Sequence, residues 1–487
     1  MEFFSTRNES NKLTFKEAII QGIAPDDGLY VPAYFPKVNI KNLQKMSYKE
    51  LAYKILSLYL TDFSEQELKL SIEKAYDIKF PDNPIPLRKI GDYYYLELYH
   101  GPTFAFKDIA LSILPQFIEI ARKSLGIKER LMVLTATSGD TGVASLEGFA
   151  NLESIEVAVF FPQNGVSEMQ KFQMTTNSAG NTLVVGIDGN FDDAQKGVKS
   201  IFNNKKVLDK IKSQNVRFTS ANSINIGRLL PQIVYYFHAY NSLVESKSIS
   251  LGDEISFSVP TGNFGNILAL YYAKEMGLPV KKLIVASNEN NILTDFFKSG
   301  VYDSKRELIL TNSPSMDIII SSNLERLLYH KTNISKLVKK TQEDLKLKGE
   351  FKFECDFSEF YPGYCNQADT LKIIREVFEE ERYLIDTHTA VAKYVADSYR
   401  KQGNDEKIVV LSTANPYKFS NAIMDSLGIE KTEDMFEDLE RIENYTSFPM
   451  PERIKMLKDK EIVHKKQIKI KEIKDTVIKF IGGRNES

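Results

Sequence analysis

One lysine of this chain lies in surroundings that could make it a nucleophile. Lys107 follows two aromatic residues, Phe104 and Phe106, within the segment 100–108. A lysine removed from water loses part of its preference for the charged ammonium, so its pKa falls and its neutral amine can attack a carbonyl carbon. On this segment alone, an ordinary surface lysine is the favoured interpretation.

Two glycine-rich turns could bind anions. Residues 137–142 have the sequence Thr-Ser-Gly-Asp-Thr-Gly, and residues 260–266 have Pro-Thr-Gly-Asn-Phe-Gly-Asn. Each turn follows an apolar run and precedes a helix-like segment, so backbone N–H groups at a helix N-terminus could receive a carboxylate or a phosphate. The second turn lacks the Lys-Ser/Thr of a nucleotide-binding loop, which favours a phosphate without a magnesium site. A capped turn that only packs remains the alternative for each.

A third candidate lies where another apolar run ends. Residues 407–412 form that run, and Thr413 follows it. Ligands of open α/β sheets bind beyond the carboxyl ends of the strands, so this hydroxyl could reach a ligand. Simple termination of the strand would give the same pattern.

The elements that would position these residues alternate between strands and helices. Strand-like runs at 131–137 and 154–161 enclose a helix-like segment at 143–151, and a second such unit spans 255–287. Repeated β-α-β units favour parallel sheets with right-handed crossovers. We therefore predict an α/β fold with open, mostly parallel sheets.

Two local signals divide the N-terminal part of the chain. Thr14 and Glu17 have capping-box spacing before a helix expected at 15–21, and Gly22 is placed to end it. The proline-rich segment 80–86 cannot be helical, so we expect a boundary between an N-terminal region and the segments described above. In the lysine-rich tail, residues 467–473 are expected to form an edge strand or a short amphipathic helix.

Composition narrows the classes of function. The chain has 487 residues, 43% of them hydrophobic and 26% charged, with a net charge of -2. This balance gives no reason to expect nucleic acid or a membrane surface as a partner. Its two cysteines and five histidines have no metal-ligand spacing, so we expect no metal site. No signal peptide or membrane-spanning run is apparent, which favours the cytoplasm.

Taken together and in this order, the segments resemble those of the threonine synthases, which are fold type II pyridoxal-phosphate enzymes. The resemblance covers about residues 3–425 and rests on an N-terminal block and several motifs. The blocks lie at 5–32, 100–108, 135–142, 220–229, 259–266, 313–318 and 413–419. Two positions depart from the family pattern: many relatives have an acid in place of Asn266 and a histidine in place of Asn415.

The resemblance implies a domain organisation. It implies two open, mostly parallel sheet domains with an additional N-terminal region. We place the N-terminal region at 1–100, a smaller α/β domain at 101–200, a larger α/β domain at 201–430 and a C-terminal tail at 431–487.

The resemblance also implies the cofactor, the reaction and the site residues. Lys107 would form the Schiff base with pyridoxal 5'-phosphate and then act as the proton-transfer group, in the conversion of O-phosphohomoserine and water to L-threonine and phosphate. The cofactor phosphate is expected at 262–266 and the pyridine nitrogen near Thr413, whose neutral hydroxyl would leave that nitrogen unprotonated. The expected cofactor-binding residues are Lys107, Asp140, Gly262, Asn263, Phe264, Gly265, Asn266 and Thr413, and the expected substrate-binding residues are Ser138, Thr141, Asn222, Ser223 and Arg228.

Two alternatives remain open at this level. A related phospho-lyase would release phosphate but end in a 2-oxo acid and ammonia, and a non-catalytic protein could retain the fold as a cofactor- or ligand-binding protein. The small-molecule substrate is the only expected partner, and the N-terminally extended branch suggests a monomer. Arg228 could bind the substrate phosphate or form a structural ion pair.

Overall fold

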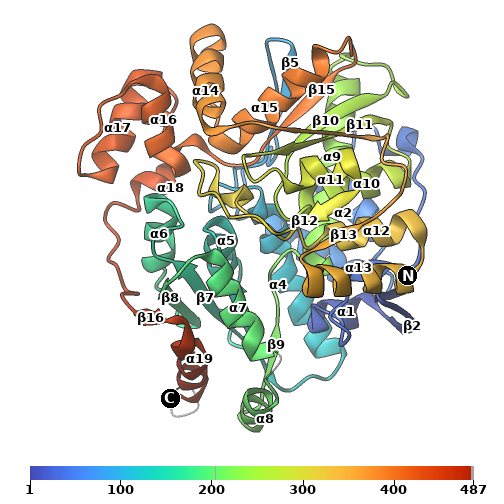
Figure 1. Cartoon of the computed structure of the whole chain (residues 1–487), viewed down its shortest axis with the longest axis vertical. Coiled ribbons are helices and arrows are strands. Elements are labelled where there is room, and N and C mark those ends of the chain that lie inside the picture. Colours follow the sequence, from blue (N-terminus) through green and yellow to red (C-terminus); the bar gives the residue numbers. More distant parts are fainter. Residues whose placement is uncertain (203, 484–487) are drawn as a thin grey trace.

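The computed structural model describes residues 1–202 and 204–483 and has an α/β fold (Figure 1). Two open sheets dominate it, one of six strands and one of five. Within the five-stranded sheet every pairing is parallel, and in the six-stranded sheet only the β4–β5 pair is antiparallel. The predicted fold class of open, mostly parallel sheets is confirmed.

The N-terminal segment forms a small antiparallel sheet followed by helices. The sheet has the order β2-β1-β3, and the helix after β2 begins with the expected capping box between Thr14 and Glu17 and ends at Gly22, whose φ is +72°. The helices pack against the long helices of the six-stranded sheet. The elements are β1 (Phe3–Ser5), β2 (Asn8–Leu13), α1 (Phe15–Gln21), β3 (Tyr30–Pro32), η1 (Ile40–Leu43), α2 (Tyr48–Leu56) and α3 (Glu65–Tyr76).

The six-stranded sheet has the order β14-β11-β10-β15-β5-β4. Its strands come from distant parts of the chain: β4 (Leu87–Ile90), β5 (Tyr93–Glu97), β10 (Ile255–Pro260), β11 (Val280–Ser287), β14 (Phe360–Tyr364) and β15 (Ile408–Ser412). The helices grouped around it are α4 (Lys107–Ser124), α9 (Ile226–Glu245), α10 (Gly265–Met276), α11 (Ile292–Ser299), α14 (Gln367–Glu381) and α15 (Thr387–Arg400).

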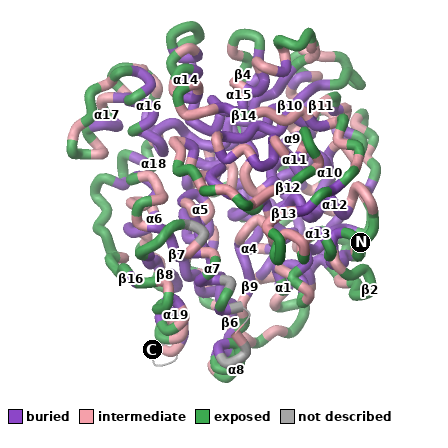
Figure 2. The backbone as a smooth tube through the Cα atoms, viewed as in Figure 1, coloured by how far each residue is buried: buried purple, intermediate pink, exposed green. Residues whose placement is uncertain are grey.

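Alternate residues of these strands pack into different hydrophobic clusters. Phe257 and Val259 of β10 belong to the cluster that contains the apolar residues of α9 and α10. Ile284 of β11 and Val410 of β15 belong to the cluster formed with α14 and α15. Both faces of the central strands are therefore buried, as expected for a mostly parallel sheet covered by helices; the buried residues concentrate there in Figure 2.

Shorter elements surround the sheet. A two-stranded ribbon, β12 (Val301–Asp303) with β13 (Glu350–Lys352), lies beside α12 (Leu324–Thr332) and α13 (Ser335–Lys348). Two single 3-10 turns, η2 (Pro314–Met316) and η3 (Pro416–Phe419), lie near the functional site described below. Between η3 and the tail lie α16 (Ser420–Leu427), α17 (Met435–Thr446) and α18 (Glu452–Lys455).

The five-stranded sheet has the order β16-β8-β7-β6-β9. Its elements are β6 (Arg130–Ala136), α5 (Asp140–Gly148), β7 (Ile155–Pro162), α6 (Glu168–Thr175), β8 (Thr182–Asp188), α7 (Phe191–Phe202), α8 (Lys205–Ser213) and β9 (Val216–Thr219). Strands on both sides of residue 200 therefore belong to one sheet. The domain boundaries expected at 100, 200 and 430 stay a prediction.

The tail contributes to this sheet. After α18 the chain runs down beside the molecule to β16 (Gln467–Lys469), as Figure 1 shows, and continues through η4 (Ile470–Glu472) into α19 (Ile473–Gly483). The segment expected to be either an edge strand or a helix therefore contains β16 and the start of α19. Ile473 and Val477 are buried in a cluster with the sheet, so the tail completes the hydrophobic core there.

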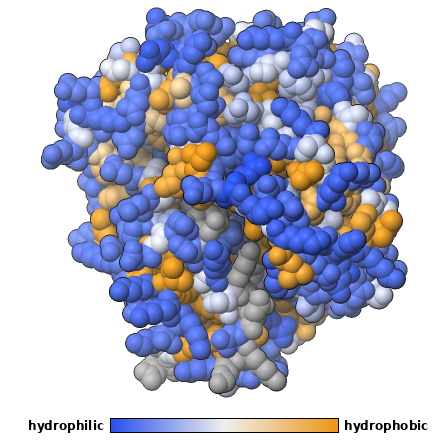
Figure 3. All heavy atoms as spheres, in the orientation of Figure 1, coloured by the Kyte–Doolittle hydropathy of each residue, from blue (hydrophilic) through white to orange (hydrophobic). Residues whose placement is uncertain are grey.

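One face of the molecule is mostly hydrophilic (Figure 3). On the face drawn in Figure 3, apolar side chains form separate small groups among charged and polar ones. Within the described parts of the chain, every helix is too short or too polar to span a bilayer.

Candidate functional site

A cavity of about 820 Å³ lies beyond the carboxyl ends of β6, β10 and β15. This is the end of a parallel sheet at which ligands bind. The structure brings every site residue expected from the sequence to the wall of this one cavity: Lys107, Ser138, Asp140, Thr141, Asn222, Ser223, Arg228, Gly262, Asn263, Phe264, Gly265, Asn266 and Thr413. Their individual roles stay predictions.

Lys107 is the first residue of α4, and its side chain is 12% exposed. Its Nζ lies 3.3 Å from Oδ2 of Asp140 and 5.1 Å from the centre of the Phe106 ring. Burial lowers the pKa of Lys107, and the positive charges of Arg228 and Lys418 lower it further, whereas Asp140 opposes them. The result is an amine poised to lose its proton inside a cavity, as a lysine nucleophile requires.

Asp140 begins α5 and is almost completely buried. Its burial alone would raise its pKa, but the nearby charges of Lys418 and Lys107 outweigh this and hold the pKa far below the usual range. The side chain is therefore a carboxylate at any physiological pH. A fixed negative charge beside Lys107 favours the ammonium form of that lysine, so the balance between the two lysines and Asp140 sets the proton on Lys107.

The turn before α10 is open to an anion. Phe264, the N-cap residue, has a φ of +61°, and no side chain caps this helix. The first N–H groups of a helix lack partners within it and carry the positive end of its dipole. Asn266 adds a side-chain donor, because Tyr236 donates to its Oδ1 at 2.6 Å while its buried Nδ2 has no hydrogen-bond partner.

A second helix N-terminus faces the same cavity. Gly139, the N-cap of α5, has a φ of +129° and no side chain of its own to cap the helix. Only glycine fits there, because a Cβ would lie 2.2 Å from Oε1 of Gln170. Thr137 fixes the turn by accepting hydrogen bonds from the N–H groups of Gly139 and Gly142, both at 2.9 Å. Ser138 and Thr141 lie between these positions and line the cavity.

Arg228 provides a third positive group. It lies in the first turn of α9, is 2% exposed and donates from Nη1 to the carbonyl of Ala221 at 2.9 Å. Its Nε is buried and has no hydrogen-bond partner. Burial lowers the pKa of Arg228 to about 10. No carboxylate pairs with Arg228 among the ion pairs of the described residues, so the ion-pair alternative has no support, and the guanidinium is free to meet an anion.

Thr413 joins the strand end to the lysine segment. Its carbonyl accepts a hydrogen bond from the N–H of Phe106 at 2.8 Å, and the residue is 4% exposed. The loop just before Lys107 is thereby fixed to the end of β15. Asn415, one of the two departures from the family pattern, caps η3 by accepting from the N–H of Tyr417 at 3.1 Å.

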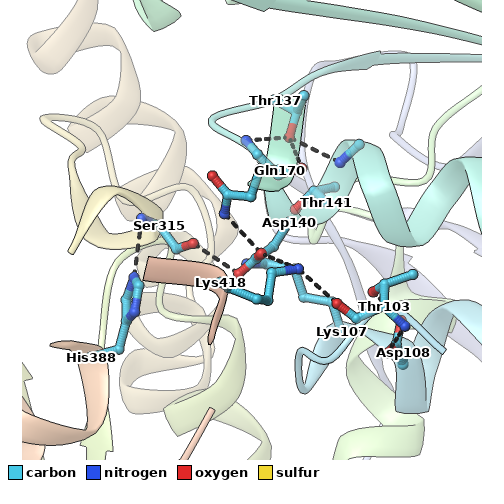
Figure 4. Close-up of polar contacts among 12 residues, drawn as sticks. Thr103, Lys107, Asp108, Thr137, Asp140, Thr141, Gln170, Ser315, His388 and Lys418 are labelled. Carbon is cyan, nitrogen blue, oxygen red and sulfur yellow. Dashed lines mark hydrogen bonds and ion pairs between the residues drawn. The ribbon is translucent and has the colours of Figure 1, made fainter. Parts of the chain in front are cut away.

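The residues that surround Asp140 were not predicted from the sequence. Gln170 donates to its Oδ1 at 2.8 Å, Ser315 donates to its Oδ2 at 3.0 Å, and Lys418 lies 2.9 Å from its Oδ1 (Figure 4). His388 accepts from the N–H of Ser315 at 3.2 Å. Ser315 and Lys418 occur in the family-like blocks, but nothing in their spacing indicated a common partner.

The arrangement is suited to binding a small, multiply charged molecule and to moving a proton at one amine. Three groups that favour anions line the wall, namely two helix N-termini and the buried guanidinium of Arg228. A nucleophilic lysine lies among them. In the described parts of the chain, no group of three His, Cys, Asp or Glu side chains is arranged to bind a metal ion.

Comparisons with known proteins place this site in one family. The family model described as "Threonine synthase N terminus" matches residues 2–76, and "Threonine synthase, C-terminal" matches residues 389–479. Threonine synthase of Saccharomyces cerevisiae is 36% identical, over 87% of this chain and 88% of the yeast protein. Human "Threonine synthase-like 1" is 40% identical, over 89% of this chain but only 61% of the human protein's length.

A solved structure agrees over the whole fold. The crystal structure of pyridoxal-phosphate-bound threonine synthase from Brucella melitensis superposes with a TM-score of 0.86 and 34% identity, covering 99% of both chains. The two-sheet arrangement and the N-terminal region are therefore common to both proteins.

Proposed function

The chain belongs to the threonine synthase family, and from that premise we propose that it is a pyridoxal-phosphate-dependent lyase acting on O-phosphohomoserine. The products are L-threonine and phosphate: phosphate leaves from the γ carbon and water adds at the β carbon. The observation that carries the proposal is the buried amine of Lys107, which shares one cavity with the N-termini of α5 and α10 and with the guanidinium of Arg228, whose Nε has no hydrogen-bond partner.

The residues present fit the cofactor. Its phosphate matches the turn at 262–266, where the helix dipole, open N–H groups and the orphaned Nδ2 of Asn266 all favour an anion. Gly262 keeps this turn close to the opposite wall, because a Cβ would lie 3.1 Å from the carbonyl of Ser315. Lys107 supplies the amine to which the cofactor aldehyde attaches, and Thr413 offers the pyridine nitrogen a neutral hydroxyl.

When bound, pyridoxal phosphate supplies an electron sink for negative charge that develops next to the substrate's amino group. Lys107 would carry out the proton transfers: its Nζ would take the α-proton and return protons to the carbon chain. The pKa of this amine is already lowered by burial, which keeps it competent as a base. Asp140 stays ionised and orients the Nζ.

The substrate needs two anion sites in addition to the cofactor's. We assign its carboxylate to the N-terminus of α5, with Ser138 and Thr141, because the positive end of the helix dipole points there. We assign its phosphate to Arg228, with Asn222 and Ser223, because the guanidinium carries unused donors.

A phospho-lyase is the second candidate. The chain is similar both to proteins called threonine synthase and to human "Threonine synthase-like 1", so the outcome after phosphate release is tested directly. Both reactions begin with phosphate release and differ only in whether water is captured at the β carbon. The same residues would serve either.

A paired assay separates the candidates. Purified protein loaded with pyridoxal phosphate is given O-phosphohomoserine, and phosphate, threonine and 2-oxobutyrate are measured together. Equal amounts of phosphate and threonine are expected; phosphate with 2-oxobutyrate and no threonine would make the protein a phospho-lyase. Lys107→Ala must abolish both outcomes, whereas a change at the surface pair, Lys281→Ala, must leave the rate unchanged.

Two finer proposals concern the setting of the enzyme. We propose that it works in the cytoplasm, which fits its low cysteine content and near-neutral charge. We also propose that it is a monomer. Light scattering on the holoenzyme tests the second point, because a dimer would double the measured mass from 55.5 kDa.

A further inference from the structure

Lys418 is a buried lysine that the proposed reaction does not use. It lies in η3, directly after β15, and its side chain is 0% exposed. Its Nζ donates to the carbonyl of Thr103 at 2.7 Å and lies 2.9 Å from Oδ1 of Asp140. An ammonium with no access to water costs free energy unless it is paired, so this position needs a reason beyond packing.

Asp140 divides its two oxygens between two lysines. Oδ1 meets Lys418 and the amide of Gln170, whereas Oδ2 meets Lys107 at 3.3 Å and Ser315 at 3.0 Å (Figure 4). Each oxygen therefore has two donors, and the two lysines contact different oxygens of one carboxylate. With both lysines protonated, two positive charges face a single negative one.

This count of charges matters when Lys107 gives up its proton. When Lys107 is neutral, Asp140 is paired with Lys418 alone, and one positive and one negative charge then form a buried ion pair. Without Lys418, a neutral Lys107 would leave a buried carboxylate with no cation in contact, and Asp140 would hold the proton on Lys107 instead. Lys418 and Arg228 both oppose that effect by lowering the pKa of Lys107.

Lys418 also fixes the loop that carries the nucleophile. Thr103 is held from two sides: its carbonyl accepts from Lys418, and its N–H and Oγ1 both donate to Asp108, the N–H at 2.8 Å. Lys107 follows this loop directly. One ammonium thus links the segment after β15, the loop before α4 and the first residue of α5.

We propose that Lys418 is a positioning residue whose charge balances Asp140, so that Lys107 can become the neutral amine that attaches the cofactor. This inference rests on the proposed function and names a residue that acts through Asp140 rather than on the substrate. It predicts that the effect of losing Lys418 depends on the charge of Asp140.

The test measures covalent attachment of pyridoxal phosphate to the cofactor-free protein across a range of pH, by the absorbance of the attached cofactor. The rate follows the fraction of neutral Lys107, so its midpoint reports the pKa of that amine. Lys418→Met keeps the apolar stem and removes the charge. Its midpoint is expected to rise by about one pH unit or more, a tenfold loss of neutral amine at a fixed pH.

A double variant separates charge balance from mere structure. In Lys418→Met with Asp140→Asn, both charges are gone, so the midpoint is expected to return toward that of the wild type; a structural role predicts two losses that add. Lys393→Met is the matched control, since its pair with Asp397 lies outside the cavity. Its midpoint is expected to stay unchanged.

Two results would overturn the inference. One is a folded Lys418→Met protein, judged by its melting curve, that attaches the cofactor with the wild-type midpoint; the other is a double variant with no return. If Lys418→Met does not fold, Asp140→Asn alone decides, because it is expected to lower the midpoint and an unchanged one would refute the idea. A wild-type protein that never attaches the cofactor would instead refute the proposed function.

Discussion

Replacing Arg228 by methionine separates the binding role of this residue from its structural role. The guanidinium is 2% exposed, makes a hydrogen bond to the carbonyl of Ala221 and leaves Nε without a partner. A buried donor without a partner costs about 1–3 kcal/mol, and a hydrogen bond from a charged group contributes about 1.5–3 kcal/mol. These terms nearly cancel, so without a bound anion Arg228→Met should change the free energy of unfolding by no more than about 1 kcal/mol.

With the substrate present, the same change should be severe. If two donors of Arg228 bind the substrate phosphate, two charge-assisted hydrogen bonds of about 1.5–3 kcal/mol each are lost. At about 1.4 kcal/mol for each factor of ten, kcat/KM should fall by about 10² to 10⁴. Inorganic phosphate should also stabilise the wild type, by about 2.7 kcal/mol at 100 times its Kd, and should not stabilise the variant.

Denaturant unfolding with and without phosphate, together with steady-state kinetics, measures both effects. Arg326→Met is the matched control, because Arg326 is also buried but donates to the carbonyls of Tyr30 at 2.9 Å and Ile224 at 2.6 Å. It should lose at least about 3 kcal/mol of stability, since several buried carbonyls lose their donor. The reasoning about Arg228 is refuted if Arg228→Met loses as much stability as this control, or if its kcat/KM stays within a factor of three.

Three further predictions concern the turn at 262–266, the start of α4 beside Lys107, and the C-terminal tail. Gly262→Ala should weaken pyridoxal phosphate binding about tenfold, because its Cβ would crowd the carbonyl of Ser315 at 3.1 Å. Titration with the cofactor measures this. The control is Gly482→Ala, whose Cβ would meet nothing closer than 3.5 Å and which should bind the cofactor normally. Burial raises the pKa of Asp108 from 3.8 to about 6, so the folded state binds its proton more tightly and the free energy of unfolding should fall as pH rises through this window. Asp108→Asn should remove that slope in unfolding experiments, and an unchanged slope would exclude Asp108 as its source. Ile473→Ala should lower the free energy of unfolding by about 2–5 kcal/mol, because it leaves a cavity between the tail and the five-stranded sheet. A loss below about 1 kcal/mol would mean that the tail is not part of the core.

The sequence determined the local structure and the family. Continuous apolar runs such as 131–137 specify strands buried on both faces, and the capping box at Thr14 and Glu17 fixes a helix start through contacts only three residues apart. Glycine-rich turns after two strands indicated where anions bind, because sheet topology places such turns at one edge. The motif blocks identified the family, and every expected site residue lines one cavity.

Only the tertiary structure decided how charge is distributed around Lys107. Asp140 brings together Lys418, Gln170 and Ser315, which are separated by up to 278 residues from it, and no periodicity in a sequence encodes such a meeting. Tertiary packing also decided that β16 joins the five-stranded sheet, since its short alternating pattern suited a strand or a helix equally. Propensity acts over a few neighbouring residues, whereas burial and ion pairing depend on which distant segments the fold brings into contact, and the pKa of Lys107 is set by those.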